Sequence, residues 1–257
     1  MLPPQQTACR LDTINGDRLI GSSAAMHQLL QQISRAATES AHVLVSGEPG
    51  TGRETIARAI HAQSASNLGP FIKVDCAKNP SEDLERMLFA SSGNRNRAGA
   101  ERRSLERVGR LSHLYQSKGG TLFLQNVIDL PARTQLRLAR VLRDREVVIT
   151  DEGTHVELDH RVITAGDPSL DAAVHDGRML SDLHRRLCVF RLEVPPLRDR
   201  REDIPELAEH LVSLLCAGAN IPCKHLSEAA QSMLTALPWR GNGNELQKLL
   251  EVLILRI

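Results

Sequence analysis

The segment Gly47-Glu48-Pro49-Gly50-Thr51-Gly52-Arg53 stands between the apolar stretch 42–45 and a helix-like stretch that carries Ile56 and Ile60. It matches the phosphate-binding pattern G-x-x-x-x-G-K except at its last position, where arginine replaces lysine. Glycines in such a loop let backbone N–H groups converge on phosphate oxygens, and the following helix adds its positive end. The flanking strand and helix favour this interpretation over an ordinary glycine-rich turn. We therefore predict a nucleotide-binding segment from Gly47 to Glu54, with each of its residues at the site.

Strand-like and helix-like segments alternate along the chain around this loop. We expect strands at 42–45, 71–74, 121–124 and 161–165, and helices that include Met26 to Ile33, Ile56 to Ile60 and Leu136 to Leu142. Parallel strands need long crossovers, and the crossover helices cover both faces of the sheet. The alternation therefore predicts an α/β fold, a three-layer sandwich around a parallel sheet.

The spacing of apolar residues changes near Asp203, and from there to the end of the chain it indicates helices only. Pro195 and Pro196 interrupt regular structure just before that point. Residues 1–18 carry no apolar periodicity and are expected to form a tail. The sequence thus predicts a tail at 1–18, an α/β nucleotide-binding domain at 19–196 and a small all-helical subdomain at 197–257.

Bulk composition excludes several classes of function. The 32 Lys and Arg residues nearly balance the 31 Asp and Glu residues, so no overall field attracts nucleic acid or an anionic membrane. Aromatic residues make up only 2%, too few for a surface that stacks single-stranded bases. The five cysteines form no C-x-x-C pair and no apolar leader is present, which favours a cytoplasmic protein. The histidines and cysteines lack the spacing of metal ligands, so we expect no structural metal.

Four motifs together give the chain a family resemblance. They are the loop from Gly47 to Glu54, Gly119-Gly120-Thr121-Leu122-Phe123-Leu124, the segment Pro195 to Ile204 and Pro238-Trp239-Arg240-Gly241-Asn242. From about Leu19 onward, the chain resembles the AAA+ ATPase domain of bacterial sigma-54-dependent transcription activators. The resemblance implies a ring-forming ATPase that remodels sigma-54 RNA polymerase. In that family the nucleotide lies between the α/β domain, a helical lid and a neighbouring subunit.

The chain departs from the family where hydrolysis takes place. The family ends its third strand with Asp-Glu, for Mg²⁺ and for the attacking water, and here the pair is Gln125-Asn126. Amides bring neither the negative charge that Mg²⁺ prefers nor a basic site. General-base assistance alone is worth about 10²- to 10⁴-fold, so turnover should be strongly suppressed. Arg53 in place of the lysine keeps the charge and predicts weakened ATP binding.

Four further positions matched to the family concern sensing and arginine fingers. The sensing asparagine corresponds to Asp167, which places an anion near the expected γ-phosphate. The first arginine finger falls on Leu180, whereas the second matches Arg186, which would act on a neighbour's nucleotide. The lid sensor arginine falls on Asn244, which removes a cationic phosphate contact.

Two arginine-rich segments lie outside these motifs. The family's sigma-54 contact loop, Gly-Ala-Phe-Thr-Gly-Ala, should fall between Phe89 and Gly119, where only Ala98-Gly99-Ala100 resembles it. Six arginines lie between Asn94 and Arg110, and a solvated loop is favoured there over a basic contact surface. The second segment carries arginines three or four residues apart, a spacing that places them on one face of a helix and predicts a solvent-exposed face: Arg133, Arg137, Arg140 and Arg143.

Three functions remain open from the sequence. The favoured one is a transcription regulator of the sigma-54 activator type that binds ATP weakly, hydrolyses it poorly or not at all, and acts by assembling with AAA+ relatives. The first alternative is an active ATP-hydrolysing activator, and the second is an interaction protein without nucleotide. Mg²⁺ binding and sigma-54 contact are not supported by the residues present. Direct DNA binding is not expected either, since no helix-turn-helix pattern follows the helical subdomain.

Overall fold

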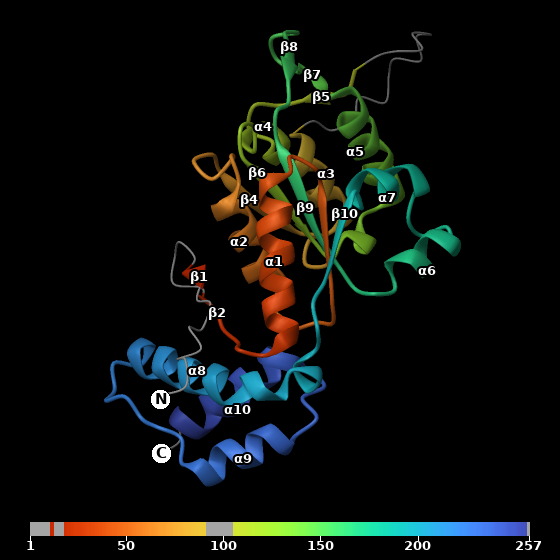
Figure 1. Ribbon diagram of the computed structural model, residues 1–257. Helices are drawn as coiled ribbons and strands as arrows, with labels where there is room; N and C mark the ends of the chain where they lie inside the picture. Colours follow the sequence, from red (N-terminus) through yellow and green to blue (C-terminus); the bar gives the residue numbers. More distant parts are fainter. Residues whose placement is uncertain (1–10, 13–17, 91–104, 256–257) are drawn as a thin grey trace.

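A five-stranded parallel sheet forms the centre of the protein in the computed structural model, which describes residues 11–12, 18–90 and 105–255 (Figure 1). The strand order is β10-β3-β9-β6-β4, and every neighbouring pair runs parallel. The bounds of these strands are β3 (Val43–Ser46), β4 (Phe71–Asp75), β6 (Thr121–Gln125), β9 (Arg161–Gly166) and β10 (Phe190–Glu193). The predicted α/β class and parallel sheet are confirmed.

Strand β10 was absent from the sequence-based expectation. Phe190 is partly buried and Leu192 fully buried, whereas the charged Arg191 and Glu193 between and after them are exposed. It pairs with β3 on one side and forms the edge of the sheet. An edge strand of this length lacks the continuous apolar run by which the central strands were recognised.

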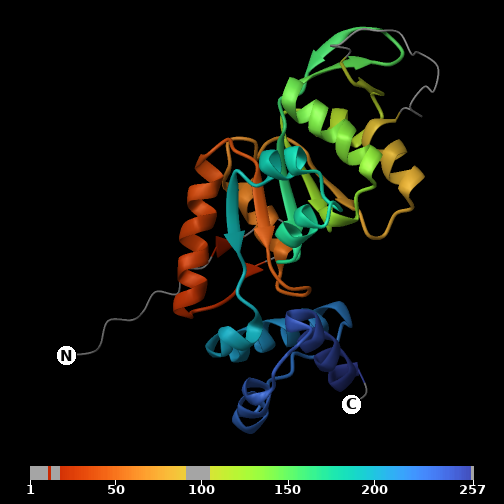
Figure 2. The same ribbon diagram turned by 90° about the vertical axis from the view of Figure 1, so that its right-hand side faces the viewer.

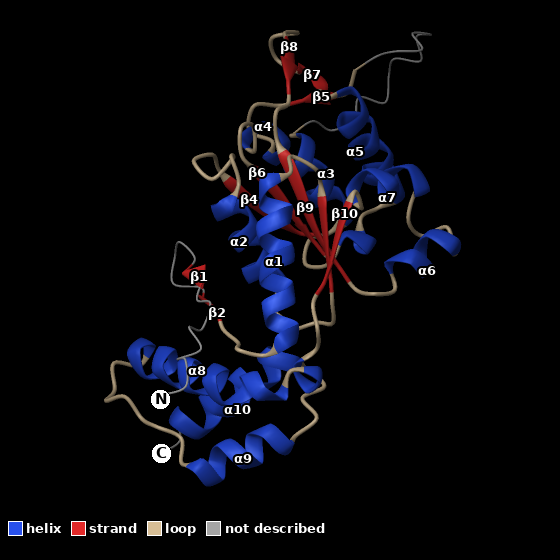
Figure 3. Cartoon of the chain, in the orientation of Figure 1, coloured by secondary structure: helices blue, strands red, loops and turns tan. Residues whose placement is uncertain are grey.

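Helices cover both faces of the sheet, as Figure 3 shows. Helices α1 (Ala24–Thr38) and α2 (Arg53–Gln63) pack against one face together with Val43, Val45 and Phe123. Leu44 and Leu122 alternate to the opposite face. That face is covered by α3 (Ser81–Phe89), α4 (His113–Gln116), α5 (Ala132–Asp144), α6 (Leu170–His175) and α7 (Ser181–Leu187). The three-layer sandwich follows from this alternation.

Two small strand groups lie outside the main sheet. A three-stranded sheet has the order β5-β7-β8 and is built from β5 (Arg107–Val108), β7 (Glu146–Ile149) and β8 (His155–Glu157). Figure 2 places it beyond α5, far from the C-terminal helices. The antiparallel pair β1 (Leu11–Asp12) and β2 (Arg18–Leu19) begins inside the expected tail.

The C-terminal part of the chain is helical and has its own core. It comprises the short 3₁₀ turns η2 (Leu197–Asp199) and η3 (Arg201–Asp203), then α8 (Ile204–Gly218), α9 (Glu228–Ala236) and α10 (Asn242–Leu255). Trp239 is buried among the apolar side chains of this region and donates Nε1 to the Leu234 carbonyl at 2.7 Å. Among the described residues, no helix is long and apolar enough to cross a membrane.

Asp203 ties this helical region to the first layer of the sandwich. Its carboxylate accepts hydrogen bonds from the backbone N–H groups of Ser22 and Ser23 and from the Ser23 hydroxyl, at 2.7 to 2.8 Å. The Ser23 side chain also caps α1 by accepting from the Met26 N–H. The start of α1 is therefore fixed against the segment that leads into the helical region.

The arginine-bearing face of α5, expected to be exposed to solvent, is partly buried. Arg133 and Arg140 are about half exposed on α5, but the Arg137 side chain is 9% exposed. Its guanidinium bonds the carboxylates of Glu85 and Glu106 at 2.8 and 3.0 Å and lies 3.8 Å from the Phe89 ring centre. The interpretation of this stripe as a solvent face was wrong at Arg137, because partners from other elements cover it.

Candidate functional site

The glycine loop, Gly47 to Arg53, leaves β3 at the carboxyl edge of the sheet and enters α2. Gly50 and Gly52 adopt φ values of 81° and 93°, which residues with a Cβ rarely adopt. A Cβ on Gly50 would also lie 2.3 Å from the Gly241 carbonyl oxygen, whereas one on Gly52 would meet open space. Gly50 is therefore required by both backbone and packing, and Gly52 by its backbone alone.

Helix α2 presents its N-terminus at this loop. Gly52 is the N-cap and provides no side-chain cap, so the first-turn N–H groups remain available to a ligand. Glu54, in the same turn, points toward other partners, because its carboxylate bonds Arg58 at 2.9 Å and also contacts Lys73. The amide groups, rather than Glu54, make this helix end suited to an anion.

Arg53 is buried where the loop joins the helix. The residue is 8% exposed and donates Nη1 to the Gly47 carbonyl at 3.1 Å. Burial lowers the pKa of Arg53, whereas the nearby carboxylates of Asp167 and Asp75 oppose that shift. The guanidinium thus lies in the field of two acidic side chains, one at the end of β4 and one directly after β9.

The ends of three neighbouring strands bring these polar residues together. Asp75 on β4 stands opposite Gln125 on β6, which in turn stands opposite Ala165 on β9. The buried Gln125 Oε1 has no hydrogen-bond partner in the described part of the chain. Asn126 follows in the left-handed conformation and donates Nδ2 to Asp75 Oδ1 at 2.9 Å. The predicted pair at 125 and 126 therefore lies beside a carboxylate that sequence reasoning missed.

Asp167 follows β9 at the same edge. Its carboxylate accepts a hydrogen bond from the Ser169 N–H at 3.0 Å and so closes its own turn. The Gly47 N–H donates to the carbonyl of Gly166, the last residue of β9, at 3.2 Å, so the carboxyl end of β9 meets the start of the glycine loop.

The helical region rests directly on the glycine loop. Glu48 accepts two hydrogen bonds from Arg198, at 2.8 and 2.6 Å, which with Asn242 lower the pKa of Glu48 to about 2. Asn242 Nδ2 also bonds the Pro49 carbonyl at 3.0 Å. The Gly243 N–H donates to the carbonyl of Gly50 at 2.9 Å. Loop and helical region are thus joined by side-chain and backbone contacts.

A hollow of about 440 Å³ opens between the loop and the helical region. The polar part of its lining includes Thr51, Thr55 and Asn244. Its apolar walls include Leu19, Ile20, Leu207, Leu211 and Leu214. Arg200 also lines it and donates Nη2 to the Thr51 carbonyl at 3.2 Å. This bond connects the glycine loop to the segment between η2 and η3.

Comparison with known proteins identifies this architecture. The Sigma-54 interaction domain family matches residues 19–193, and the AAA+ ATPase lid domain family matches residues 198–256. The chain belongs to the sigma-54-dependent activator family. Response regulator protein PilR of Pseudomonas aeruginosa is 38% identical over 236 residues, covering 91% of this chain and 51% of that protein. NtrC of Klebsiella pneumoniae is 37% identical over 229 residues, covering 89% of this chain and 47% of that protein.

Solved structures show the same relationship. NtrX of Brucella abortus in complex with ADP superposes with a TM-score of 0.81 at 33% identity, covering 93% of this chain and 52% of that one. Its complex with ATP gives 0.79 at 34% identity, covering 93% and 50%. This chain spans about half the length of the curated relatives it matches.

The other positions matched to sigma-54-dependent activators lie in separate places. Asn244 lines the hollow, beside Gly50. Leu180 caps α7 and donates its N–H to Gln135 Oε1 at 2.7 Å. Arg186, further along α7, pairs with Asp182 at 3.3 Å and is not among the residues that line the hollow. The expected sigma-54 contact segment around Ala98 to Ala100 lies outside the described residues.

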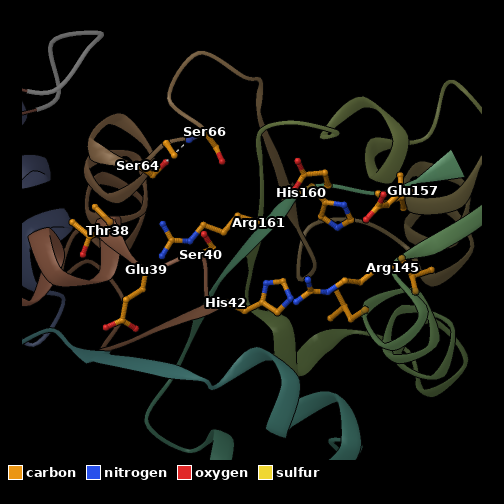
Figure 4. A pocket seen from close by; sticks show the side chains of 16 residues that line it. Thr38, Glu39, Ser40, His42, Ser64, Ser66, Arg145, Glu157, His160 and Arg161 are labelled. Carbon is orange, nitrogen blue, oxygen red and sulfur yellow. Dashed lines mark hydrogen bonds between the residues drawn. The ribbon is translucent and has the colours of Figure 1, made fainter.

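A second hollow of about 170 Å³ lies at the opposite, amino edge of the sheet (Figure 4). Helices α1, α2 and α5 direct their carboxyl ends at it, and Glu39, Glu157 and Asp159 line it. Helix carboxyl ends and carboxylates disfavour an anion, whereas Arg145 and Arg161 also line this hollow. Of these two hollows, the one at the carboxyl edge of the sheet is lined by the glycine loop and the first turn of α2 in this sigma-54 activator domain.

Two contributors to the site were missed by sequence reasoning. Arg200 lies within the motif that carries the family resemblance, but its contact with Thr51 crosses 149 positions of sequence. Asp75 directly follows the expected strand at 71–74, and a polar residue at a strand's carboxyl end was the available signal.

Proposed function

We propose that this domain binds ATP in the hollow between the glycine loop and the lid, hydrolyses it slowly, and regulates transcription by assembling with AAA+ relatives. The observation that carries the proposal is the hollow itself, which joins an uncapped helix N-terminus, a glycine loop and a lid. NtrX of Brucella abortus, of the same architecture, has been solved in complex with ATP and with ADP. The unit boundaries belong to the same proposal, with the tail ending at 18 and the lid beginning at 197.

The phosphates and the base of the nucleotide would contact different kinds of groups. The N–H groups of the glycine loop and of the first turn of α2 would hold the phosphates, and Arg53 would add a positive charge. The apolar wall at Leu19, Ile20 and Leu211 would take the flat base. Asn244 would contact the phosphate side as a neutral donor in place of an arginine.

Slow hydrolysis follows from the end of β6. Gln125 offers a neutral amide oxygen where Mg²⁺ prefers a carboxylate, so this position does not fit a protein-held Mg²⁺ ion. Mg²⁺ would arrive as part of the ATP chelate. Asn126 likewise lacks a basic oxygen, which removes general-base assistance.

Assembly with relatives is supported by the asymmetry between the chain's own site and the surface it offers to a neighbour. Arg186 remains on α7 with a side chain that is 30% exposed, although Gln125 and Asn126 replace the residues for the chain's own hydrolysis. Mixing the protein with a hydrolysing sigma-54 activator should change that activator's ATPase rate and the mass of the assembly. Unchanged rate and mass would remove this part of the proposal.

Titration calorimetry with ATP and Mg²⁺ tests binding directly. We expect saturable binding that Arg53→Ala weakens and that the control Arg58→Ala, five residues later on α2, leaves largely unchanged. Heat-free titrations of the folded protein would instead favour an interaction protein without nucleotide. Phosphate release at the rate of an active activator would favour the orthodox ATPase.

A further inference from the structure

We propose that this domain holds ADP more tightly than ATP, because the carboxylates of Asp75 and Asp167 stand where a third phosphate would lie. The inference rests on the proposed nucleotide binding and names the form of the nucleotide that the domain retains. It follows from what lines the hollow and from what stands at the strand ends beyond it.

The lining of the hollow accounts for a base and a short phosphate chain. Leucines of α8 form much of its apolar wall, and its polar side includes residues 50–52 of the glycine loop together with Thr55. Arg53, Asp75 and Asp167 are not among the residues that line it. A base on the apolar wall therefore leaves the loop to the phosphates, and a longer chain has to extend past the hollow.

The glycine loop connects the lid to the strand ends, and this sets the direction of the phosphate chain. At the lid end, the Gly243 N–H donates to the Gly50 carbonyl at 2.9 Å. At the sheet end, the Gly47 N–H donates to the Gly166 carbonyl at 3.2 Å, and Asp167 is the next residue. Phosphates that follow the loop from the lid therefore approach the Asp167 carboxylate as the chain lengthens.

Asp75 adds a second carboxylate at the same edge of the sheet. It stands opposite Gln125, which stands opposite Ala165, two residues before Asp167. Both carboxylates oppose the fall that burial causes in the pKa of Arg53. Two acidic side chains thus already share the charge of Arg53 before a nucleotide binds.

Arg53 is held in place at the base of the loop. The residue is 8% exposed, and its Nη1 donates to the Gly47 carbonyl at 3.1 Å. A guanidinium is a broad planar fork, whereas the ammonium of lysine is a compact charge on a flexible stem. Arg53 therefore stays near Gly47 and the two carboxylates, and does not follow a lengthening phosphate chain.

A third phosphate brings more charge than contact. ATP carries one phosphate and one negative charge more than ADP, and like charges within about 4 to 6 Å disfavour one another. Sites that transfer the terminal phosphate neutralise it with cationic side chains and metal ions. Gln125 and Asn244 are neutral amides at this site. The third phosphate therefore meets two anions with little to compensate them.

The two carboxylates are not arranged as a metal site that could reverse this effect. Asp75 Oδ1 accepts hydrogen bonds from Asn126 Nδ2 at 2.9 Å and from the Ala77 N–H at 3.2 Å. Asp167 Oδ1 accepts from the Ser169 N–H at 3.0 Å. Within the described ranges, no group of three or more acidic, histidine or cysteine side chains could hold a metal ion. The carboxylates therefore act on a phosphate directly.

Titration calorimetry with ADP, ATP and AMP tests the preference, first in EDTA, where no Mg²⁺ supports hydrolysis, and then with Mg²⁺. In EDTA we expect ADP to bind about 10-fold more tightly than ATP. AMP should bind more weakly than ADP, because it offers the loop a single phosphate. Mg²⁺ should narrow the preference for ADP without reversing it. ATP that binds as tightly as ADP in EDTA, or more tightly with Mg²⁺, overturns the proposal.

Asp167→Asn separates the charge from the fold. Asparagine keeps an Oδ1 acceptor for the Ser169 N–H, so the turn after β9 is retained. We expect ATP affinity in EDTA to rise about 5- to 10-fold and ADP affinity to change less than about twofold. A purely structural role would move both affinities together. An unchanged ratio of the two affinities overturns the proposal.

Asp151→Asn is the matched control. It makes the same isosteric change at an exposed carboxylate in the turn between β7 and β8, outside the residues that line the hollow. Both affinities should stay at their original values. A rise in ATP affinity equal to that of Asp167→Asn would mean that overall charge, rather than the strand ends, sets the preference, and would overturn the proposal.

Binding and preference fail separately. If neither ADP nor ATP binds to the unaltered protein, the proposed function itself is wrong. If both bind with equal affinity in EDTA, nucleotide binding stands and the preference for ADP is overturned.

Discussion

Each edge of the central sheet buries an arginine, and the two arginines have different surroundings. Arg161, at the amino edge, is 5% exposed and donates to the backbone carbonyls of Ala41, at 3.0 Å, and Ala36. Arg53, at the carboxyl edge, is 8% exposed and donates to Gly47 within a loop whose helix N-terminus is uncapped. Arg161 therefore serves the last turn of α1, whereas Arg53 faces groups that suit a ligand.

The comparison shows that burial of a charge does not by itself mark a functional site. Helix carboxyl ends, carboxylates, Arg145 and two histidines surround Arg161, and its bonds to the carbonyls of Ala36 and Ala41 satisfy the end of α1 and the loop after it. Arg53 is influenced by the carboxylates of Asp75, at the end of β4, and Asp167, directly after β9, and it lies at the uncapped N-terminus of α2. Both arginines donate to backbone carbonyls, so the surroundings differ rather than the bonded partner: Arg53 lies at the uncapped N-terminus of α2, and Arg161 lies among helix carboxyl ends.

The largest expected effect concerns pH at the amino edge. Burial, followed by the charges of Arg145 and Arg161, lowers the pKa of His42 to about 4, and burial followed by His42 lowers that of His160 to about 4. The unfolded chain binds these protons near pH 6.5, so stability is lost as pH falls from 6.5 toward 4. Linkage gives about 2 kcal/mol for each histidine at pH 5. Urea unfolding at pH 7.5 and 5 measures the loss.

His160→Gln should remove about half of this pH dependence, whereas His225→Gln, at an exposed side chain, should leave it unchanged. Equal slopes for the original protein and His160→Gln would show that the amino edge does not bury neutral histidines.

The next largest effect is expected from replacing Arg161, the arginine at the amino edge. Arg161→Met takes away the donors to Ala36 and Ala41, and leaving buried carbonyls unpaired should cost about 3 kcal/mol of unfolding free energy. Urea unfolding measures this cost, and the folded fraction should bind ATP with its original affinity. Loss of ATP affinity at full stability would reverse the distinction between the two edges.

Replacing Arg53 should lower ATP affinity more than stability, the reverse of the result expected for Arg161. Arg53→Met removes a charge from the proposed phosphate site and should weaken ATP binding by about 2 kcal/mol, or roughly 30-fold. Unfolding free energy should change less than in Arg161→Met, because Arg53 bonds a single carbonyl within its own loop. Calorimetry and urea unfolding on the same sample decide between the two roles.

The smallest effect concerns the contact between loop and lid. Arg198→Ala removes the exposed pair with Glu48, so the melting temperature should fall only slightly. The difference from the original protein should shrink between about 0.05 and 1 M salt, because salt screens exposed charges. A large, salt-independent fall would mean that this pair, rather than the buried Asn242, holds the lid on the loop.

Sequence reasoning succeeded where short-range pattern decides structure. The strands at Val43–Ser46 and Thr121–Gln125 are fully or almost fully buried, and their apolar runs are visible without any fold. It failed at Phe190–Glu193, whose edge position permits charged residues, and at Arg137, whose acidic partners lie 31 and 52 positions away. The roles assigned to Gln125, Asn126, Asp167 and Arg186 remain predictions, and their positions are now defined.

By itself, the sequence determined the alternation of strands and helices, the glycine loop and the family, because periodic burial and turn chemistry are local properties. Only the tertiary structure decided which strand ends meet. Asp75 and Asn126 are 51 positions apart, and nothing local to either specifies that β4 and β6 are neighbours. The order of strands in a parallel sheet depends on how the crossover helices pack on its two faces, and the chemistry at the carboxyl edge depends on that order.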